Sequence, residues 1–418
     1  MNAKSVRMRG FPEYIKVEDA LTKILTRIQR TEPEAIPVTE SLGRIIYDDI
    51  HSSRDIPHFD RAAMDGYAVI AEDTFGSSQH KPTKLKVIGE VTVGKPPKLK
   101  VSRGEAAQIA TGAPVPSKAN AVVMVEYTNP INSEIEVYSP VTPGQNVSKI
   151  GEDVKRGQKV ISSGKQIRPQ EEAMLLQCGI TEMRVAKKPQ VAIVSTGNEL
   201  VDINTPPEIG QVVGTNSYAL ASLVRVYGGE PKILGIYPDV PEELEKAIDE
   251  ASKYDAGVFT GGTSVGKYDY LPSLLEKKGE LVFHGVAMKP GSPVAFSFIE
   301  DKPIFSLPGY PAATIIAFTV FVAPSIRKML GAGKLDPRVF VEAKMSGKVA
   351  STLGRRDFVR VKIEETDEGI LAVPLRASGS GVMSSMVDAD GLVEIPENVE
   401  GINEGELVRV ALFPHIVA

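Results

Sequence analysis

The spacing of apolar and polar residues divides the chain into stretches of different secondary structure. A helical period near the N-terminus joins the apolar residues Val17, Ala20, Leu21, Ile24, Leu25 and Ile28 and predicts an amphipathic helix. From residue 51 to about 145, prolines separate short β-like runs such as 84–88 and 121–125, which predicts a small β-rich domain. From 190 to about 330, strand-like and helix-like stretches alternate and predict a mostly parallel sheet covered by helices. The short alternating strands after 339 predict a small β-barrel or sandwich.

The composition is typical of a multidomain globular protein. The 418 residues exceed what one compact core accommodates, so roughly two to four domains are expected. The net charge of −5 and the lack of a long Lys/Arg run argue against nucleic acid as a partner. With one cysteine, Cys178, the chain forms no internal disulfide, which fits the cytoplasm. The apolar neighbours of Cys178 favour a small buried residue over a nucleophile.

The sequence predicts neither export nor a membrane span. Basic residues occur in 1–10, but no apolar region follows them, so we expect no signal peptide. The apolar stretch 314–323 has about half the length that a membrane span needs, and it predicts a buried helix instead.

The most informative local feature is a glycine-rich turn between a predicted strand, 255–259, and a predicted helix, 271–278. The turn contains Gly261, Gly262, Thr263, Ser264 and Gly266. Such a turn lets backbone N–H groups approach an anion, and the helix N-terminus adds a favourable dipole. The alternative is a tight structural turn. The turn matches neither the Walker pattern nor the dinucleotide-binding Gly-x-Gly-x-x-Gly pattern.

Carboxylates form a second group of candidate residues. Glu199, Asp239 and Asp269 each follow a predicted strand of the same sheet, and ligands of such sheets bind outside the carboxyl ends of the strands. Hard oxygen donors suit Mg²⁺, which bridges carboxylates and phosphate oxygens that would otherwise repel each other. Asp65, in the β-rich stretch, is a further candidate. Taken singly, each of these residues is better explained as a cap or turn residue, and the position of three of them at strand ends of one sheet favours a metal site.

Basic and proline-rich segments complete the candidate set. Lys289 is followed by two prolines and a glycine that fix the backbone of 288–293, and it could bind a phosphate or an oxyanion as a point charge. The alternative is a solvated loop lysine. Pro308 and Pro311 either shape a pocket floor or simply start a helix. Arg355 and Ser380 belong to two segments whose arginines and hydroxyls suit a tetrahedral oxyanion. The histidines lack the spacing of a zinc site or of a Ser-His-Asp triad.

Seven ordered motifs resemble the molybdopterin molybdenumtransferase family, which includes MoeA and the gephyrin E domain. They occupy residues 59–68, 110–116, 151–153, 195–200, 261–266, 289–291 and 307–311, and the resemblance covers essentially the whole chain. It implies an elongated homodimer of four-domain subunits. The expected domains are a discontinuous linker and dimerisation domain (1–50 and 147–186), an inserted β-rich domain (51–146), a doubly wound α/β domain similar to molybdopterin adenylyltransferase (187–330) and a C-terminal β-barrel (331–418).

The resemblance also implies a reaction and a set of site residues. Family members take adenylylated molybdopterin and molybdate, release AMP and leave the metal on the dithiolene sulfurs. We expect Glu199, Asp239 and Asp269 to hold Mg²⁺, and residues 262–266 to bind the pterin's phosphate. Asp65 and Thr111 are expected to reach the site from the partner subunit, and Lys289, Arg355 and Ser380 to bind molybdate. Glu152, Asp153, Pro308 and Pro311 also lie on matched motifs and are expected to bind substrate.

Three positions depart from the pattern of many relatives. Ser292 stands where they carry Lys, Tyr310 where they carry Asn, and Asn198 where they carry Asp. Loss of the lysine removes a positive charge from the oxyanion region, so the choice between molybdate and tungstate is open. Two other functions remain as alternatives: a dimeric binding scaffold, as gephyrin provides, and the adenylyltransferase of the preceding step. That adenylyltransferase, which is also a candidate partner, would be a single α/β domain.

Overall fold

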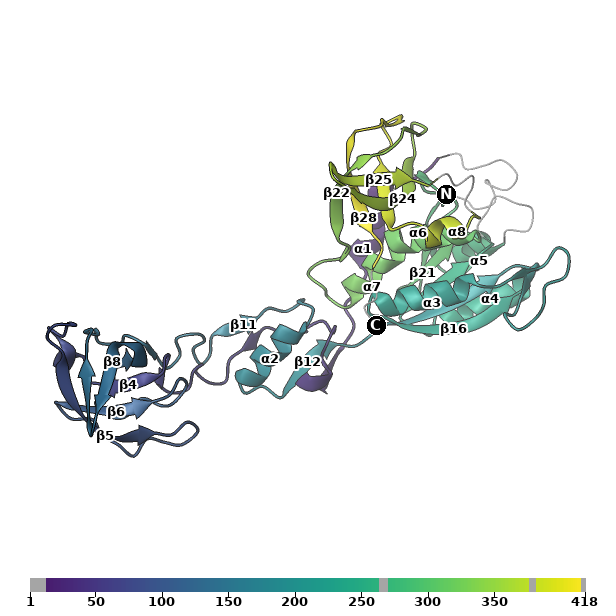
Figure 1. The fold of residues 1–418 in the computed structure, drawn as a ribbon. Coiled ribbons are helices and arrows are strands. Elements are labelled where there is room, and N and C mark those ends of the chain that lie inside the picture. Colours follow the sequence, from purple (N-terminus) through teal and green to yellow (C-terminus); the bar gives the residue numbers. More distant parts are fainter. Residues whose placement is uncertain (1–12, 263–269, 376–380, 415–418) are drawn as a thin grey trace.

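The computed structural model describes residues 13–262, 270–375 and 381–414, which form an elongated molecule (Figure 1). A β-rich domain lies at one end. An α/β domain with an adjoining β-barrel lies at the other, and a small connecting domain lies between them. The multidomain architecture of α/β and β parts that the sequence predicts is confirmed.

The connecting domain is built from chain segments that are far apart in sequence. Strands from both segments pair with each other, and both contribute to one apolar cluster that contains Val38, Ile46 and Leu175. The chain leaves this domain, forms the β-rich domain and then returns. The elements are β1 (Pro33–Pro37) paired with β12 (Glu182–Ala186), β2 (Ile50–His51) paired with β11 (Lys159–Ile161), the 3₁₀ helix η2 (Val38–Glu40) and α2 (Pro169–Gln177).

The β-rich domain contains a six-stranded sheet in the order β7-β4-β6-β5-β9-β8. Successive residues of the interior strand β4 face opposite sides, because Tyr67 and Val69 join one apolar cluster and Ala68 joins another. The sheet is therefore covered on both faces. Its elements are β4 (Gly66–Val69), β5 (Thr83–Val91), β6 (Glu105–Ile109), β7 (Ala121–Met124), β8 (Thr128–Ile131), β9 (Glu134–Val137), the pair β3 (Arg61–Ala62) and β10 (Val147–Ser148), and the 3₁₀ helices η3 (Ala71–Thr74) and η4 (Val125–Tyr127).

The α/β domain is doubly wound, as predicted. Its sheet has the order β16-β13-β17-β21-β20-β18, in which the first four strands are parallel and the last two antiparallel. Helix α3 packs on one face with Val191 and Ile193, and helices α4 and α5 pack on the other with Ala192 and Val194. The elements are β13 (Gln190–Thr196), β14 (Leu200–Val201), β15 (Val212–Val213), α3 (Asn216–Val226), β16 (Glu230–Tyr237), α4 (Pro241–Ala251), β17 (Ala256–Thr260), α5 (Leu271–Lys278), β18 (Glu280–His284), β20 (Ala295–Ile299) and β21 (Lys302–Leu307).

A buried helix follows β21 and fills the core between this domain and its neighbours. It consists of α6 (Pro311–Ala317), a π-helical turn η5 (Phe318–Val322) and α7 (Ala323–Met329). At 19 residues it is long and apolar enough to cross a membrane, but 83% of its apolar window is buried inside the protein. The buried helix predicted from 314–323 is confirmed, although it is longer than that apolar run. Helix α1 (Val17–Arg27) packs against it, burying Val17 and Ala20 in the same cluster.

The C-terminal domain is a closed five-stranded barrel. Its strands follow the order β24-β25-β22-β28-β26, and a further pairing of β24 with β26 closes the circle. The short strand β19 (Met288–Lys289), from the α/β domain, adds to β24 in parallel and joins the two domains. The other elements are β22 (Phe340–Met345), β23 (Val349–Ala350), β24 (Arg356–Thr366), β25 (Gly369–Pro374), α8 (Ser384–Val387), β26 (Gly391–Ile395), β27 (Gly401–Ile402) and β28 (Leu407–Leu412).

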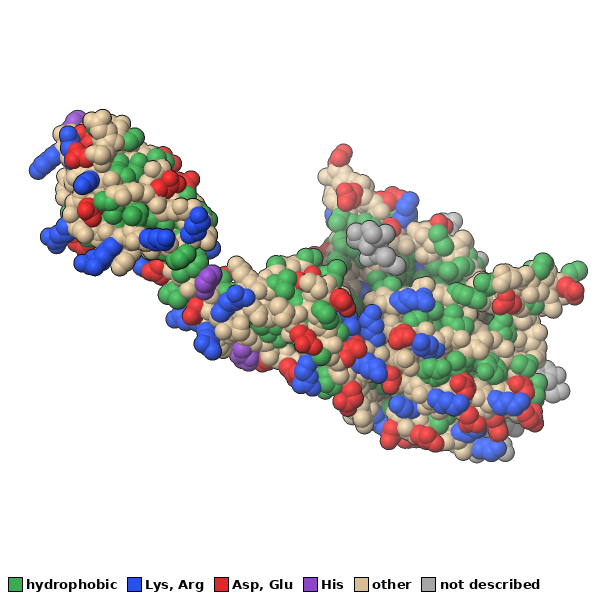
Figure 2. Space-filling model, turned by 90° about the horizontal axis from the view of Figure 1, so that it is seen from below, with side chains coloured by type: hydrophobic (Ala, Val, Ile, Leu, Met, Phe, Trp, Pro, Cys, Tyr) green, Lys and Arg blue, Asp and Glu red, His purple; other side chains and the backbone are tan. Residues whose placement is uncertain are grey.

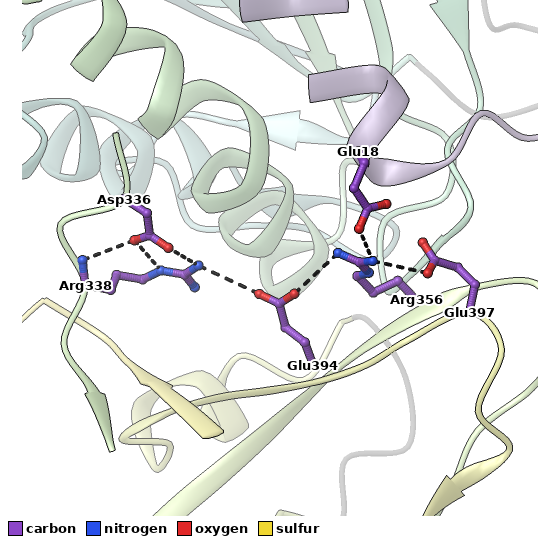
Figure 3. A network of polar contacts seen from close by, with 6 residues as sticks. All are labelled: Glu18, Asp336, Arg338, Arg356, Glu394 and Glu397. Atoms are coloured by element: carbon purple, nitrogen blue, oxygen red, sulfur yellow. Dashed lines mark hydrogen bonds and ion pairs between the residues drawn. The ribbon is translucent and has the colours of Figure 1, made fainter. Parts of the chain in front are cut away.

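A chain of ion pairs links the barrel to α1 and to the segment that enters the barrel (Figure 3). Arg356 contacts Glu18 of α1 and, on its other side, Glu397 at 3.2 Å. Glu394 lies between Arg356 at 3.7 Å and Arg338 at 3.8 Å. On the face of the molecule that Figure 2 shows, charges of both signs are interspersed.

Candidate active site

The main cavity of the α/β domain has a volume of about 670 Å³ and lies at the carboxyl ends of β13, β16, β17 and β21. This is where the sequence predicts a ligand, because side chains and loops after parallel strands meet at one edge of the sheet. Its wall includes Glu199, Asp239, Gly261, Gly262 and Pro308, all of which are sequence candidates. Pro311 lines it as well.

The floor of the cavity presents hydroxyl groups and a close-packed backbone. Ser195 and Thr196 are buried, and their hydroxyl oxygens have no hydrogen-bond partner among the residues that the structure describes. Gly261 and Gly262 have φ angles of 101° and 60°, in the left-handed region that favours glycine. A side chain on Gly261 would collide with the Thr196 carbonyl oxygen. The glycines therefore lie directly beside the Thr196 hydroxyl, and the floor carries two buried hydroxyls without a hydrogen-bond partner among the described residues.

Two of the three predicted carboxylates line this cavity. Glu199 lies in the loop after β13, where a methyl group on Gly197 would lie 2.7 Å from Glu199 Oε1. Asp239 follows β16, and its Oδ1 lies 3.7 Å from the position of a Cβ on Gly262. Asn198 Oδ1 accepts a hydrogen bond from the Asp239 N–H at 3.1 Å. Asn198, which stands where many relatives carry Asp, therefore links the loop after β13 to the loop after β16.

Several predicted site residues lie outside the described residues. These are Thr263, Ser264, Gly266, Asp269 and Ser380. Among the residues that are described, no three His, Cys, Asp or Glu side chains form a cluster able to hold a metal ion. Glu199 and Asp239 offer carboxylate oxygens in the cavity wall, a type of donor that suits Mg²⁺, which usually keeps further ligands from substrate and water.

Asn216 is a cavity residue that is not among the site candidates from the sequence. It is the first residue of α3, after Thr215 at the N-cap position. Asn216 Nδ2 donates to the Gly309 carbonyl at 2.7 Å and lies 3.0 Å from Thr260 Oγ1. Asn216 therefore fixes the loop after β21 against the ends of β17 and α3, and the sequence carries no local signal of this long-range contact.

Two of the predicted oxyanion ligands, Lys289 and Arg355, are not among the residues that line the cavity. Lys289 Nζ lies 3.6 Å from the Asp357 carboxylate, because β19 pairs with β24. The Arg355 guanidinium lies 5.1 Å from the centre of the Tyr14 ring. Ser292 Oγ donates to the Met288 carbonyl at 2.8 Å and closes the turn after Lys289.

The remaining candidates lie in or beside the β-rich domain, far from the cavity of the same chain (Figure 1). Thr111 donates to Asp65 Oδ1 through its backbone N–H at 2.6 Å and its hydroxyl at 2.9 Å. Both hydrogen bonds lower the pKa of Asp65, and the bond from the Thr111 backbone N–H has the larger effect. Glu152 and Asp153 are exposed at the entry to the connecting domain, where Glu152 accepts from the Lys149 N–H.

Comparison with known proteins places the chain in a family. Three family models match successive parts of it: "MoeA N-terminal region (domain I and II)" over 15–179, "Probable molybdopterin binding domain" over 192–328, and "MoeA C-terminal region (domain IV)" over 342–413.

Full-length relatives agree with these matches. A molybdopterin biosynthesis protein of Methanocaldococcus jannaschii is 41% identical over 90% of this chain and 92% of its own. The molybdopterin molybdenumtransferase of Staphylococcus aureus is 32% identical over 95% of both chains. The crystal structure of the molybdopterin biosynthesis MoeA protein of Pyrococcus horikoshii superposes with a TM-score of 0.84, at 40% identity, over 97% of this chain and 100% of that chain.

Fold and site therefore define an enzyme of molybdenum cofactor biosynthesis built around a molybdopterin-binding α/β domain. The chain belongs to the molybdopterin molybdenumtransferase family, and it is a transferase of that pathway. The resemblance drawn from the seven motifs is confirmed.

Proposed function

We propose that the protein transfers molybdenum from molybdate, or tungsten from tungstate, to the dithiolene of adenylylated molybdopterin and that AMP leaves in the same reaction. The observation that carries the proposal is the cavity itself, in which two carboxylates lie beside buried hydroxyls and a glycine-rich backbone. Acidic groups repel a phosphate ester unless a cation lies between them. A nucleotide conjugate with a divalent cation therefore fits this cavity better than a free anion or a neutral ligand.

Mg²⁺ is the proposed cation, with Glu199 and Asp239 as protein ligands. Both side chains offer hard oxygen donors in one cavity. When bound, Mg²⁺ supplies charge neutralisation at the phosphates, which eases departure of AMP. Asp269 is a further proposed ligand from outside the described residues.

The other cavity residues bind and orient the substrate. The Ser195 and Thr196 hydroxyls can donate to phosphate oxygens from the floor, where water is excluded by burial. Asn216 positions the loop that carries Gly309. Lys289, Arg355 and Ser380 are proposed to bind the metal oxyanion. To do so, Lys289 would give up its ion pair with Asp357.

We further propose a homodimer in which Asp65 and Thr111 complete the partner's cavity. Their hydrogen-bonded pair is exposed and far from the cavity of its own chain. Mixing Asp65→Ala subunits with Glu199→Ala subunits tests this. Each variant alone should be inactive, and after subunit exchange a shared site should restore roughly a quarter of the wild-type activity. No recovery despite proven exchange would contradict a shared site.

The transferase reaction is tested with purified protein, adenylylated molybdopterin, Mg²⁺ and molybdate. We expect AMP release together with metal-loaded dithiolene, and a large loss of both in Asp239→Asn. AMP release that is absent in the wild type, or unchanged in Asp239→Asn, would reject the proposal. The experiment also separates the scaffold alternative, because a scaffold needs neither carboxylate. We place the enzyme in the cytoplasm, where its buried Cys178 stays reduced.

A further inference from the structure

Tyr310 is a large aromatic residue that stands exposed at the mouth of the cavity. It lines the cavity with Gly309 and Pro311, yet 65% of it is accessible to solvent. A single exposed aromatic residue is ordinary on a protein surface. This one differs because its backbone is fixed and because it borders the cavity that binds the substrate.

The loop that carries Tyr310 is held by polar groups from other elements. Asn216 Nδ2 donates to the carbonyl of Gly309, and Thr314 donates to the carbonyl of Tyr310 through its backbone N–H and its hydroxyl, both at 2.9 Å. Pro311 begins helix α6 directly afterwards and restricts the backbone further. The Tyr310 Cα therefore has a defined position, and only its side-chain torsions remain to be ordered by a ligand.

One edge of the ring lies against the C-terminal domain. A Cβ on Gly381 would lie 3.3 Å from Tyr310 Cδ1 and 3.6 Å from Cε1, so only glycine fits there without displacing the ring. Tyr310 thus bridges the α/β domain and the barrel at the cavity mouth. Most of the ring remains accessible to a ligand.

The cavity carries polar groups at its floor and a mixed rim. The buried hydroxyls of Ser195 and Thr196 lie at the floor, whereas Tyr310 and Val212, which is 51% exposed, lie at the rim together with the exposed Glu199. A ligand with phosphates and a flat ring would find polar groups inside the cavity and one aromatic surface at its mouth. The phosphate would enter first, and the ring would remain at the level of Tyr310.

We propose that Tyr310 is a specificity-determining residue, whose ring stacks on a fused heteroaromatic ring of the substrate. The inference rests on the proposed placement of the adenylylated substrate in this cavity. Both the purine and the pterin of that substrate have the required flat π-surface. Stacking of this kind favours the ligand without reading its hydrogen-bonding pattern.

Binding measurements with Tyr310→Phe and Tyr310→Asn test the proposal. Asparagine removes the ring but is a favoured residue before a helix, so the fold should persist. Titration calorimetry in Mg²⁺ uses two probes, AMP and neopterin monophosphate, to separate the purine from the pterin. For the ring that stacks, we expect roughly 5- to 100-fold weaker binding to Tyr310→Asn and a nearly unchanged affinity in Tyr310→Phe. Inorganic pyrophosphate, which has no ring, should bind all three proteins alike.

A fluorescent reporter supplies independent evidence, because the chain contains no tryptophan. Tyr310→Trp should bind both probes as tightly as the wild-type protein does. If AMP is the probe that stacks on the ring, AMP should quench the fluorescence of the new tryptophan. Phe75→Trp is the control, since Phe75 is 57% exposed in the β-rich domain.

Each outcome bears on the proposal in one direction. Equal affinities of Tyr310→Asn and wild type for both probes would overturn the stacking role while leaving the transferase site intact. Wild-type protein that binds neither probe nor pyrophosphate would instead contradict the site itself.

Discussion

The Asn216 side chain donates a hydrogen bond to the Gly309 carbonyl at 2.7 Å, across 93 positions of the sequence. This contact joins the first turn of α3 to the loop after β21, which carries Tyr310. A Cβ on Gly309 would lie 3.5 Å from the Cα of Gly261, so the same loop also packs beside the glycine-rich turn. The shape of the cavity depends on both contacts.

Replacing Asn216 by Asp should damage catalysis more than folding. A carboxylate cannot donate to the Gly309 carbonyl and would repel it, so the loop would shift. We expect kcat/KM for AMP release to fall between about 10- and 100-fold, because small displacements of positioning groups are costly. Asn129→Asp, on an exposed strand of the β-rich domain, is the control. An unchanged kcat/KM in Asn216→Asp would show that the loop keeps its position without this bond.

Replacing Gly261 by Ala should destabilise the α/β domain. Its φ of 101° is unfavourable for alanine, and the new methyl group would collide with the Thr196 carbonyl oxygen. Gly104→Ala separates these effects, because Gly104 has a φ of 72° but nothing within 4 Å of the new Cβ. We expect Gly104→Ala to lower the free energy of unfolding by about 1 kcal/mol and Gly261→Ala by about 2 kcal/mol or more. Equal losses in urea denaturation would exclude a clash at Gly261.

Arg338 and Glu394 should respond differently to loss of their charges. The Arg338 side chain is 8% exposed, and its guanidinium compensates both Asp336 at 2.8 Å and Glu394 (Figure 3). Arg338→Met leaves two acidic groups facing each other and should cost about 3 kcal/mol of stability. Burial raises the pKa of Glu394.

The raised pKa of Glu394 sets the sign of its effect. An acid whose pKa is higher in the folded state favours folding when protonated, and this contribution is lost as the pH rises through that pKa. Glu394→Gln should therefore be neutral or stabilising at pH 8. If Glu394→Gln lowered the free energy of unfolding as much as Arg338→Met does, the ionised Glu394 would have to stabilise the contact between the barrel and the neighbouring segments.

Glu171 should make the connecting domain sensitive to acid. The hydrogen bond from the Arg168 side chain has the largest effect on the Glu171 carboxyl, and Lys165 adds to it. Together they outweigh the opposing effect of burial and lower the pKa of Glu171 to about 2. An acid with a depressed pKa stabilises the fold above its unfolded pKa, near 4.5, and this contribution disappears as the pH falls toward 2.

The expected size of this effect is modest, because Arg168 and Lys165 are about half exposed and screened by water. Glu171→Gln should cost on the order of 2 kcal/mol at pH 7 and roughly half of that or less at pH 3. Glu182→Gln, an exposed residue of the same domain, should cost little at either pH. A loss in Glu171→Gln that does not change between pH 7 and pH 3 would contradict an ionic origin.

Local sequence patterns predicted the elements whose signals lie within one segment. Helix α5 has the predicted bounds, and α1 and β17 differ from prediction by one residue, because period, capping and burial act over a few residues. The buried helix was predicted too short, since its apolar run ends before Pro324. The π-helical turn ahead of that proline lets the helix continue.

Contacts between distant segments could not be predicted in the same way. Asparagine is a residue type that often caps helices, but the Asn216 side chain binds the Gly309 carbonyl in the loop after β21. Lys289 is adjacent to Asp357 only because β19 joins the sheet of the barrel. The shared placement of Glu199 and Asp239 was predictable, because both follow parallel strands of one sheet and such ends lie at one edge.

The most direct test concerns the link between Mg²⁺ and nucleotide binding. AMP affinity should be measured by calorimetry with and without Mg²⁺ in wild type, Glu199→Gln and Asp239→Asn, with Glu208→Gln, an exposed carboxylate outside the cavity wall, as the control. We expect Mg²⁺ to strengthen AMP binding at least about 10-fold in wild type and Glu208→Gln, and hardly at all in the two cavity variants. The same Mg²⁺-dependent gain in all four proteins would contradict the assignment of Glu199 and Asp239 as the groups that hold the cation.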